Sequence, residues 1–145
     1  MKVYECMCNE VNWVKPSDSI ANCAKIMNEN HIGCVPVCDE SESVIGLVTD
    51  RDIVLRSIAA DKDVNSTPVS EIMTNNVCIC SPETDIEYAQ SIMSENQIRR
   101  IPVVEDNRLV GIITLGDLAA NKEVNNEGVS STLESICNCD CKNAE

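Results

Sequence analysis

The sequence predicts an α+β fold in which one β-α-β-β-α unit occurs twice, and three observations support this prediction. The stretch "SIANCAKIMNENHIGCVPV" (19–37) is repeated as "DIEYAQSIMSENQIRRIPV" (85–103), and similarity of this kind identifies a duplicated structural unit. In each copy, apolar residues at helical spacing precede short segments rich in β-branched residues. The chain of 145 residues is 43% apolar, which suits one compact domain or two small units on a shared core.

Each copy is expected to begin with a short strand, "EVNWV" (10–14) or "NVCIC" (76–80), which ends before Pro16 or Pro82. A helix follows. In the first copy its apolar residues have the spacing of one helical face, and they are Ile20, Cys23, Ala24 and Met27. In the second copy, Thr84 and Glu87 have the spacing of a capping box.

Two short strands and a second helix complete each copy. The expected strands are "CVPVC" and "VIGLVT" in the first copy, and "IPVV" and "LVGIIT" in the second. The turn between them is one residue shorter in the second copy, and surface loops tolerate such a change. The second helices begin at "DRDIVLRSIAA" and "LGDLAANK".

These elements divide the chain into four segments. The first repeat is expected at 1–60 and the second at 71–122. The polar, turn-rich residues 61–70 are expected to form a linker. Residues 123–145 are expected to form a Cys-rich C-terminal tail, interpreted as mobile with reduced thiols.

The net charge of −13 argues against binding to nucleic acid, because an acidic protein repels phosphate backbones. Only Tyr4, Trp13 and Tyr88 are aromatic, too few for a base-stacking surface. No apolar run approaches the ~18 residues that span a bilayer, and residues 1–10 do not resemble a signal peptide. We therefore expect a cytoplasmic protein that binds neither nucleic acid nor membrane.

The repeated pattern apolar-Pro-Val, polar turn, apolar-Gly-apolar-apolar-Thr-x-x-Asp, preceded by an amphipathic helix, resembles the CBS domain. Two copies in tandem resemble a Bateman module of the small stand-alone type, and the match covers roughly residues 5–122. The resemblance implies that the repeats pack about a pseudo-two-fold axis with their sheets face to face. It also implies two clefts between them, which in the family commonly hold adenosine nucleotides or S-adenosylmethionine.

The Thr-x-x-Asp motif has two physical interpretations. A carboxylate one turn into a helix can accept both hydroxyls of a ribose, while a Thr hydroxyl can reach ribose or phosphate oxygens. The same residue pair also caps a helix without any ligand. Because the motif occurs twice, and because the family uses these positions for ribose and phosphates, Thr49, Asp52, Thr114 and Asp117 are predicted ligand-binding residues.

Arg99 and Arg100 precede the Pro of the second copy, where the first copy has Gly33 and Cys34. Arginine suits phosphate oxygens because its donors form a planar fork, and family members often place basic residues here. The alternative interpretation is a solvated pair of charges. We include Arg99 and Arg100 among the predicted ligand-binding residues, while the first copy binds a less charged nucleoside or nothing.

The ten cysteines are mostly interpreted as small buried hydrophobic residues. The tail carries Cys137, Cys139 and Cys141, and alternating thiolates can bind zinc or copper(I). This spacing lacks the C-x-x-C pairs typical of zinc sites. Cys38 is the one other position that the resemblance nominates as a metal ligand.

No nucleophile–base set, P-loop or acid/base pair is found in the sequence. We therefore predict a non-catalytic regulatory module that binds AMP, ADP, ATP or S-adenosylmethionine, with no resident cofactor. A homodimer is expected, and the output would pass through that dimer or a separate regulated protein. The alternative is a thiol redox or zinc sensor that uses the CBS scaffold as a frame.

Overall fold

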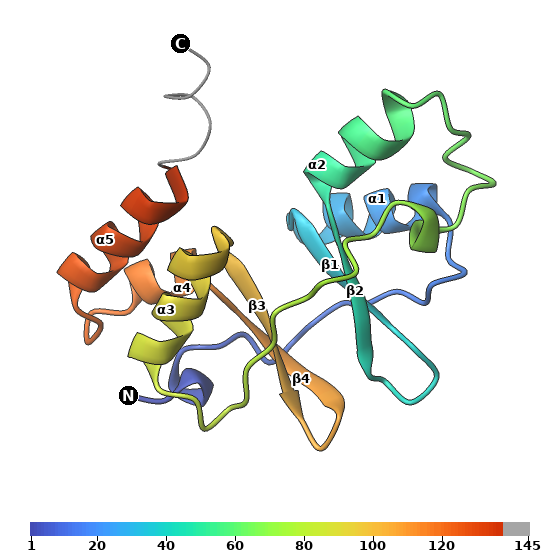
Figure 1. Cartoon of the computed structure of the whole chain (residues 1–145). Coiled ribbons are helices and arrows are strands. Elements are labelled where there is room, and N and C mark those ends of the chain that lie inside the picture. Colours follow the sequence, from blue (N-terminus) through green and yellow to red (C-terminus); the bar gives the residue numbers. More distant parts are fainter. Residues whose placement is uncertain (138–145) are drawn as a thin grey trace, which may run out of the picture. The chain divides into compact units, whose positions relative to one another are not determined.

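The computed structural model describes residues 1–137, which form two compact units (Figure 1). Unit 2 consists of Val11–Val77 and Asp106–Leu109. Unit 1 consists of Met1–Glu10, Cys78–Glu105 and the described residues from Val110 onward. Both contain a two-stranded sheet and helices, so the predicted α+β fold of two repeats is confirmed.

The elements of unit 2 are α1 (Ile20–Asn30), β1 (Cys34–Cys38), β2 (Val44–Thr49) and α2 (Asp50–Ile53), which continues directly into a π-helix (Val54–Ile58). β1 and β2 are antiparallel, with Cys34 opposite Thr49. The helical face predicted from the sequence is confirmed, because α1 buries Ile20, Cys23 and Met27. These side chains pack on the fully buried strand β1.

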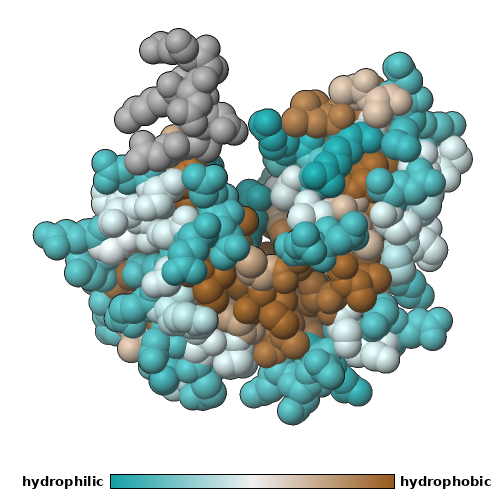
Figure 2. All heavy atoms as spheres, viewed as in Figure 1, coloured by the Kyte–Doolittle hydropathy of each residue, from teal (hydrophilic) through white to brown (hydrophobic). Residues whose placement is uncertain are grey.

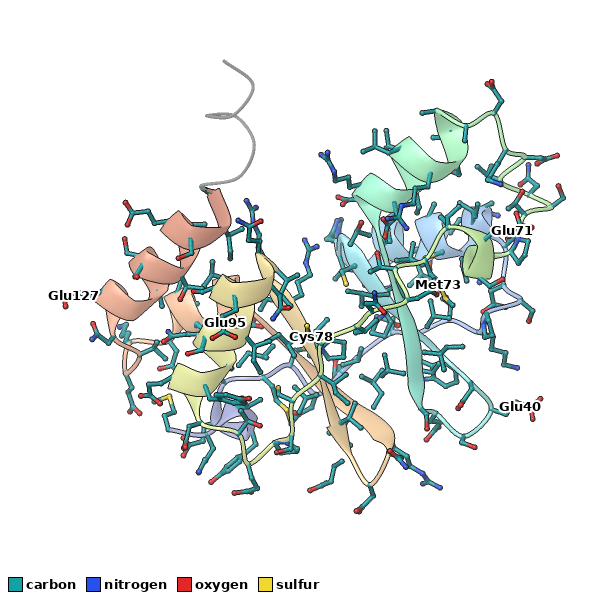
Figure 3. The ribbon with its side chains drawn as sticks, viewed as in Figure 1. Glu40, Glu71, Met73, Cys78, Glu95 and Glu127 are labelled. Atoms are coloured by element: carbon teal, nitrogen blue, oxygen red, sulfur yellow. The ribbon has the colours of Figure 1, made fainter. Side chains whose placement is uncertain are left out.

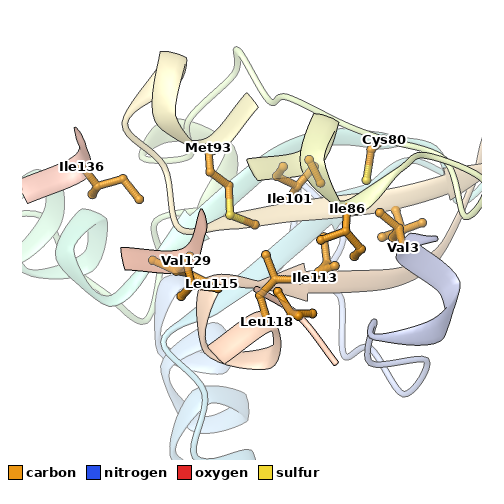
Figure 4. Packing of buried hydrophobic residues seen from close by; sticks show 13 residues of the cluster. Val3, Cys80, Ile86, Met93, Ile101, Ile113, Leu115, Leu118, Val129 and Ile136 are labelled. Atoms are coloured by element: carbon orange, nitrogen blue, oxygen red, sulfur yellow. The ribbon is translucent and has the colours of Figure 1, made fainter. Parts of the chain in front are cut away.

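The elements of unit 1 are α3 (Ile86–Asn96), β3 (Arg100–Glu105), β4 (Arg108–Thr114), α4 (Leu115–Ala120) and α5 (Asn126–Cys137). Figure 4 shows how α3, the two strands and α5 enclose one apolar cluster, to which Met93, Ile101, Ile113 and Leu118 contribute fully buried side chains. Both this cluster and that of unit 2 consist mainly of aliphatic and sulfur-containing side chains, as the aromatic-poor composition requires.

The segment that precedes each repeat packs on the other repeat. Val3, on a 3-10 helix (Val3–Glu5), belongs to the core of unit 1, and Cys8 forms a bridge with Ile112 of β4. Val69, on a 3-10 helix (Val69–Glu71) that begins inside the expected linker, belongs likewise to the core of unit 2. The two repeats have therefore exchanged equivalent segments.

Two glycines allow this exchanged packing. A Cβ on Gly111 of β4 would lie 2.9 Å from the carbonyl oxygen of Cys8, closer than a side chain tolerates. A Cβ on Gly46 of β2 would meet the Sδ atom of Met73, whose side chain is labelled in Figure 3. Glycine at these positions lets each exchanged segment run directly beside its edge strand.

The expected strands at 10–14 and 76–80 are much shorter than predicted. Only single parallel bridges form, between Val14 and Val37 of β1 and between Cys80 and Val103 of β3. The backbone of Val14 donates to Pro36 and accepts from Cys38, at 3.0 Å in both cases. The apolar residues at 10–14 and 76–80 are thus explained by one bridging residue pair and partial burial in each segment, and not by a continuous β-strand.

The capping box predicted from Thr84 and Glu87 is wrong. Helix α3 begins at Ile86, and its N-cap is Asp85. The Asp85 carboxylate forms an ion pair with Lys2 Nζ at 2.8 Å, and the Ile86 N–H donates to the Met1 carbonyl at 3.0 Å. The exchanged N-terminal segment therefore caps this helix, while Thr84 Oγ1 accepts from the Ser81 N–H.

The tail expected to be mobile contains a packed helix, which corrects that interpretation for residues 126–137. Helix α5 buries Val129, Thr132 and Ile136 and packs on α3 and α4. At Gly128 a Cβ would lie 3.0 Å from Gln90 Oε1, so glycine permits the close approach of α5 to α3. Cys139 and Cys141 lie outside the described residues.

Acidic side chains are distributed over the outer surfaces of both units. Glu40, Glu95 and Glu127 are exposed, and Figure 3 shows Glu40 and Glu127 pointing away from the ribbon. Within residues 1–137, every helix is too short or too polar to cross a bilayer.

Candidate functional site

In unit 1, the end of β4 and the start of α4 place Thr114 and Asp117 in direct contact. Thr114 Oγ1 accepts the Asp117 N–H at 3.0 Å. The Asp117 Oδ2 atom accepts both the Thr114 N–H and the Thr114 hydroxyl, each at 2.8 Å. This reciprocal pattern is a capping box, and it fixes the position of the carboxylate at the edge of the sheet.

A backbone hydrogen bond places Arg99 beside the same helix start. The Leu115 N–H donates to the Arg99 carbonyl at 2.9 Å. Arg99 is exposed, and Arg100, the first residue of β3, is partly buried. Neither arginine takes part in an ion pair within residues 1–137. Unit 1 therefore places the backbone of Arg99 beside the start of α4, with Arg100 next along the chain.

Unit 2 repeats this arrangement without the cations. Thr49 Oγ1 accepts the Asp52 N–H at 3.0 Å, and Asp52 Oδ2 accepts the Thr49 N–H at 3.0 Å. The Asp50 N–H donates to the Gly33 carbonyl at 3.0 Å, in the position that Arg99 occupies in unit 1. Each unit therefore assembles its own predicted residues, at equivalent places.

Asp52 also has two partners that the sequence interpretation missed. The Nε atom of Arg56 lies 3.6 Å from Asp52 Oδ1, and the Thr74 hydroxyl donates to Asp52 Oδ2 at 3.5 Å. The spacing of Asp52 and Arg56 is that of an i, i+4 helical ion pair, so this contact carried a sequence signal. Thr74 comes from the exchanged segment, and no local pattern indicated it.

The chemistry available at these sites is hydrogen bonding and charge recognition. A carboxylate next to a Thr hydroxyl can accept the hydroxyls of a sugar diol, and charge assistance strengthens such bonds. Arg99 and Arg100 add donors suited to phosphate oxygens. This combination favours a ligand with a polyol part and, at unit 1, a negatively charged part.

The described cysteines are dispersed over both units rather than gathered at one place. Within residues 1–137, no group of three or more His, Cys, Asp or Glu side chains is placed to hold a metal ion. Cys38 is fully buried, and burial, together with the nearby Asp39 and Glu42 carboxylates, raises the pKa of its thiol to about 11. Cys137 is exposed at the end of α5, where its Sγ atom lies 4.0 Å from Arg99 Nη2.

Comparison with known sequences gives one family. The CBS domain model matches residues 3–58 and 69–122. CBS domain-containing protein YhcV of Bacillus subtilis is 40% identical over 134 residues, covering 92% of this chain and 94% of that protein. Hypoxic response protein 1 of Mycobacterium tuberculosis is 31% identical over 127 residues, covering 88% of this chain and 87% of that protein.

Solved structures give the same result. Hypoxic Response Protein I, crystallised with two coordinated zinc ions, has a TM-score of 0.77 and 32% identity, over 82% of this chain and 97% of that chain. The CBS domain pair of protein MJ0100, in complex with 5'-methylthioadenosine and S-adenosyl-L-methionine, has a TM-score of 0.75 and 29% identity. That match covers 82% of this chain and 97% of the other.

Proposed function

Because this chain belongs to the CBS domain family, we propose that it is a non-catalytic regulatory module that binds an adenosine-type ligand. AMP, ADP, ATP and S-adenosylmethionine are the candidates. The ribose would be held by Thr114 and Asp117, and by Thr49 and Asp52 where the first copy is occupied. Arg99 and Arg100 would contact phosphate.

The observation that carries this proposal is the placement of Asp117. Its carboxylate is held by Thr114 and lies on a helix start whose first N–H bonds the carbonyl of Arg99. Backbone contacts within one unit therefore connect Asp117, which can accept hydrogen bonds from ribose hydroxyls, to Arg99, which can donate hydrogen bonds to phosphate oxygens. The ligands of the MJ0100 pair, which are adenosine derivatives, support the choice of an adenosine compound over other sugars.

Binding would act through assembly or a partner. The CBS domain match covers residues 3–58 and 69–122, and we propose that the output of binding passes to another protein or through contacts between copies. We propose a cytoplasmic homodimer whose association or partner affinity changes with the ligand. Sedimentation of the protein with and without ATP measures the assembly directly.

Thermal unfolding of the full chain tests the binding proposal. A ligand that binds only the folded state raises the melting temperature, and at about 100 times its Kd it adds about 2.7 kcal/mol of stability. We expect this increase with at least one of AMP, ADP, ATP or S-adenosylmethionine, and none with inorganic phosphate at equal ionic strength. An unchanged melting temperature with all of them contradicts the proposal.

A zinc sensor is the second candidate, because the homologous Hypoxic Response Protein I was crystallised with two zinc ions. Metal analysis of the purified protein and thiol counts before and after mild oxidation test it. A rise in melting temperature with zinc, and with none of the adenosine compounds, would favour this function.

A further inference from the structure

The two Thr-x-x-Asp motifs differ in what surrounds their carboxylates, and this difference extends the proposed function, on which it rests. We propose that the two copies are functionally unequal. In this proposal, unit 1 binds the adenosine ligand through Asp117. In unit 2, Arg56 and Thr74 occupy the Asp52 carboxylate, so that Asp52 stabilises the fold instead of binding ligand.

Both carboxylate oxygens of Asp52 are engaged inside the protein. Oδ2 accepts from the Thr49 N–H and the Thr74 hydroxyl, and Oδ1 faces Arg56 Nε at 3.6 Å. Arg56 also donates from Nη1 to the Ile72 carbonyl at 3.5 Å, which holds its guanidinium over the carboxylate. Asp52 is 8% exposed. A ribose diol would have to displace the Arg56 contact to reach Oδ1.

In Asp117, only one of the two carboxylate oxygens accepts hydrogen bonds from the protein. Within residues 1–137, every hydrogen bond that its side chain accepts comes from Thr114, and both bonds end on Oδ2. The Oδ1 atom is therefore available to a ligand. Asp117 is also more exposed than Asp52, because Asp117 is partly buried whereas Asp52 is buried.

The repeat alignment explains why the two carboxylates differ. In unit 1, Asn121 takes the position that Arg56 has in unit 2, and Cys8 takes the position of Thr74. The Asn121 side chain donates to the Cys6 Sγ atom at 3.2 Å and not to the Asp117 carboxylate, although the Asn121 N–H donates to the Asp117 carbonyl at 3.2 Å. Neither replacement provides a cation for the carboxylate.

The phosphate side shows the same inequality. Arg99 lies beside the helix start of unit 1, whereas Gly33 takes that place in unit 2. Unit 1 thus offers a free carboxylate oxygen and two cations without carboxylate partners, while unit 2 offers an occupied carboxylate and no cation at those positions. Both differences favour ligand binding in unit 1.

Isothermal titration of the full chain with AMP and ATP tests the proposal through the matched variants Asp117→Asn and Asp52→Asn. We expect about one ligand per chain in the unchanged protein. Asp117→Asn should weaken binding roughly tenfold or more, as expected for loss of a charged hydrogen bond. Asp52→Asn should lower the melting temperature and change the Kd by less than about twofold, because ligand contacts are not lost.

A second pair of variants avoids the capping boxes, in case Asp117→Asn does not fold. Arg99 and Arg51 are both exposed arginines beside a helix start, one in each unit. Arg99→Gln should weaken ATP binding by roughly fivefold or more and AMP binding less, since the charged hydrogen bonds to phosphate are lost. Arg51→Gln should leave both affinities nearly unchanged.

The outcomes separate this inference from the proposed function. If neither AMP nor ATP nor S-adenosylmethionine binds the unchanged protein, the proposed function fails and the inference falls with it. If a ligand binds but two equal sites are found, or Asp52→Asn weakens binding as much as Asp117→Asn, the function stands and the inequality is refuted. Appearance of a second, weaker site in Arg56→Asn would support the role given to Arg56.

Discussion

At the scale of single residues, burial sets three core cysteines apart from two exposed ones. Cys23, Cys38 and Cys80 lie in the two cores, and burial raises the pKa of each thiol to about 11. Cys8 and Cys137 are exposed. With a pKa near 11, the buried thiols stay protonated at neutral pH. Because the thiolate is the reactive form, these thiols should react slowly.

This difference predicts the alkylation pattern of the folded protein. At pH 8, iodoacetamide should label the exposed Cys8 and Cys137 before the three core cysteines. Cys23, Cys38 and Cys80 should react more slowly by about 100-fold or more, because a pKa near 11 instead of 9.0 lowers the thiolate fraction by that factor. Peptide mass spectrometry after timed labelling measures each rate.

The same experiment in urea provides the control, because all of these thiols should react at similar rates once the chain is unfolded. Raising the pH from 8 to 10 should accelerate labelling of the buried thiols in proportion to the increase in their thiolate fraction. Rapid labelling of Cys38 in the folded protein would contradict the assignment and would reopen its candidacy as a metal ligand.

At this scale, the contacts of the candidate site between residues close in the sequence were predictable from their spacing. Thr49 with Asp52, and Thr114 with Asp117, meet as the motif indicated, because three residues separate the N-cap from the position that bonds back to it. The contact of Thr74 with Asp52 was not predictable, because it depends on which repeat the segment before the second copy packs against.

At the scale of elements, helix α5 shows how a polar composition concealed a helical pattern. Val129, Thr132, Leu133 and Ile136 have the spacing i, i+3, i+4 and i+7. The structure buries Val129, Thr132 and Ile136 against unit 1. The serines and the glutamate between these positions make the segment polar overall, and this composition is typical of a loop.

A matched pair of substitutions on α5 tests its contribution to stability. Ile136 is 6% exposed and Leu133 is 43% exposed on the same helix. Ile136→Ala should lower the free energy of unfolding by about 2 kcal/mol or more, because a buried methyl-rich side chain is lost. Leu133→Ala should change it by less than about 0.5 kcal/mol.

Urea unfolding followed by circular dichroism measures both values. Equal effects of Ile136→Ala and Leu133→Ala would show that α5 does not pack on α3 and α4 as described.

Another element of interest is the helix formed by α2 and the π-helix that continues it. Val54, Leu55 and Ile58 are at least half exposed, and Figure 2 shows hydrophobic surface over this helix. At the corresponding positions the second copy has Ala119, Ala120 and Glu123. The two copies therefore differ in their helix surfaces as well as in their carboxylates.

At the scale of the whole molecule, the duplicated architecture was predicted correctly, because paired identities in core and turn positions fix the order of elements. The assignment of segments to units was not predictable. A repeat alignment shows which residues correspond, but it does not show whether a flanking segment packs on its own copy or on the other. Val3 and Val69 do the latter.

The exchange predicts that a substitution near the N-terminus weakens the distant second repeat. Val3 is fully buried in unit 1, and Val3→Ala should destabilise it by about 1.5 kcal/mol, mostly through lost burial. Hydrogen exchange should accelerate in α3, β3 and β4 more than in α1, β1 and β2. Val69→Ala, the matched variant, should give the opposite distribution, since Val69 packs in unit 2.

Acceleration confined to α1 and its neighbours in Val3→Ala would mean that each leading segment packs on its own repeat.

In the sequence, most of unit 2 lies between residues 1–10 and the later parts of unit 1, and this order has a consequence for biosynthesis. Apart from a four-residue turn, unit 2 is one continuous stretch, Val11–Val77, whereas unit 1 needs Met1–Glu10 together with residues from Cys78 onward. On the ribosome, residues 1–10 emerge early and have no docking surface until the second repeat has been translated. Most of unit 2 can therefore fold while the chain is still being synthesised. Unit 1 can fold only later, when residues from Cys78 onward are available to pack against residues 1–10.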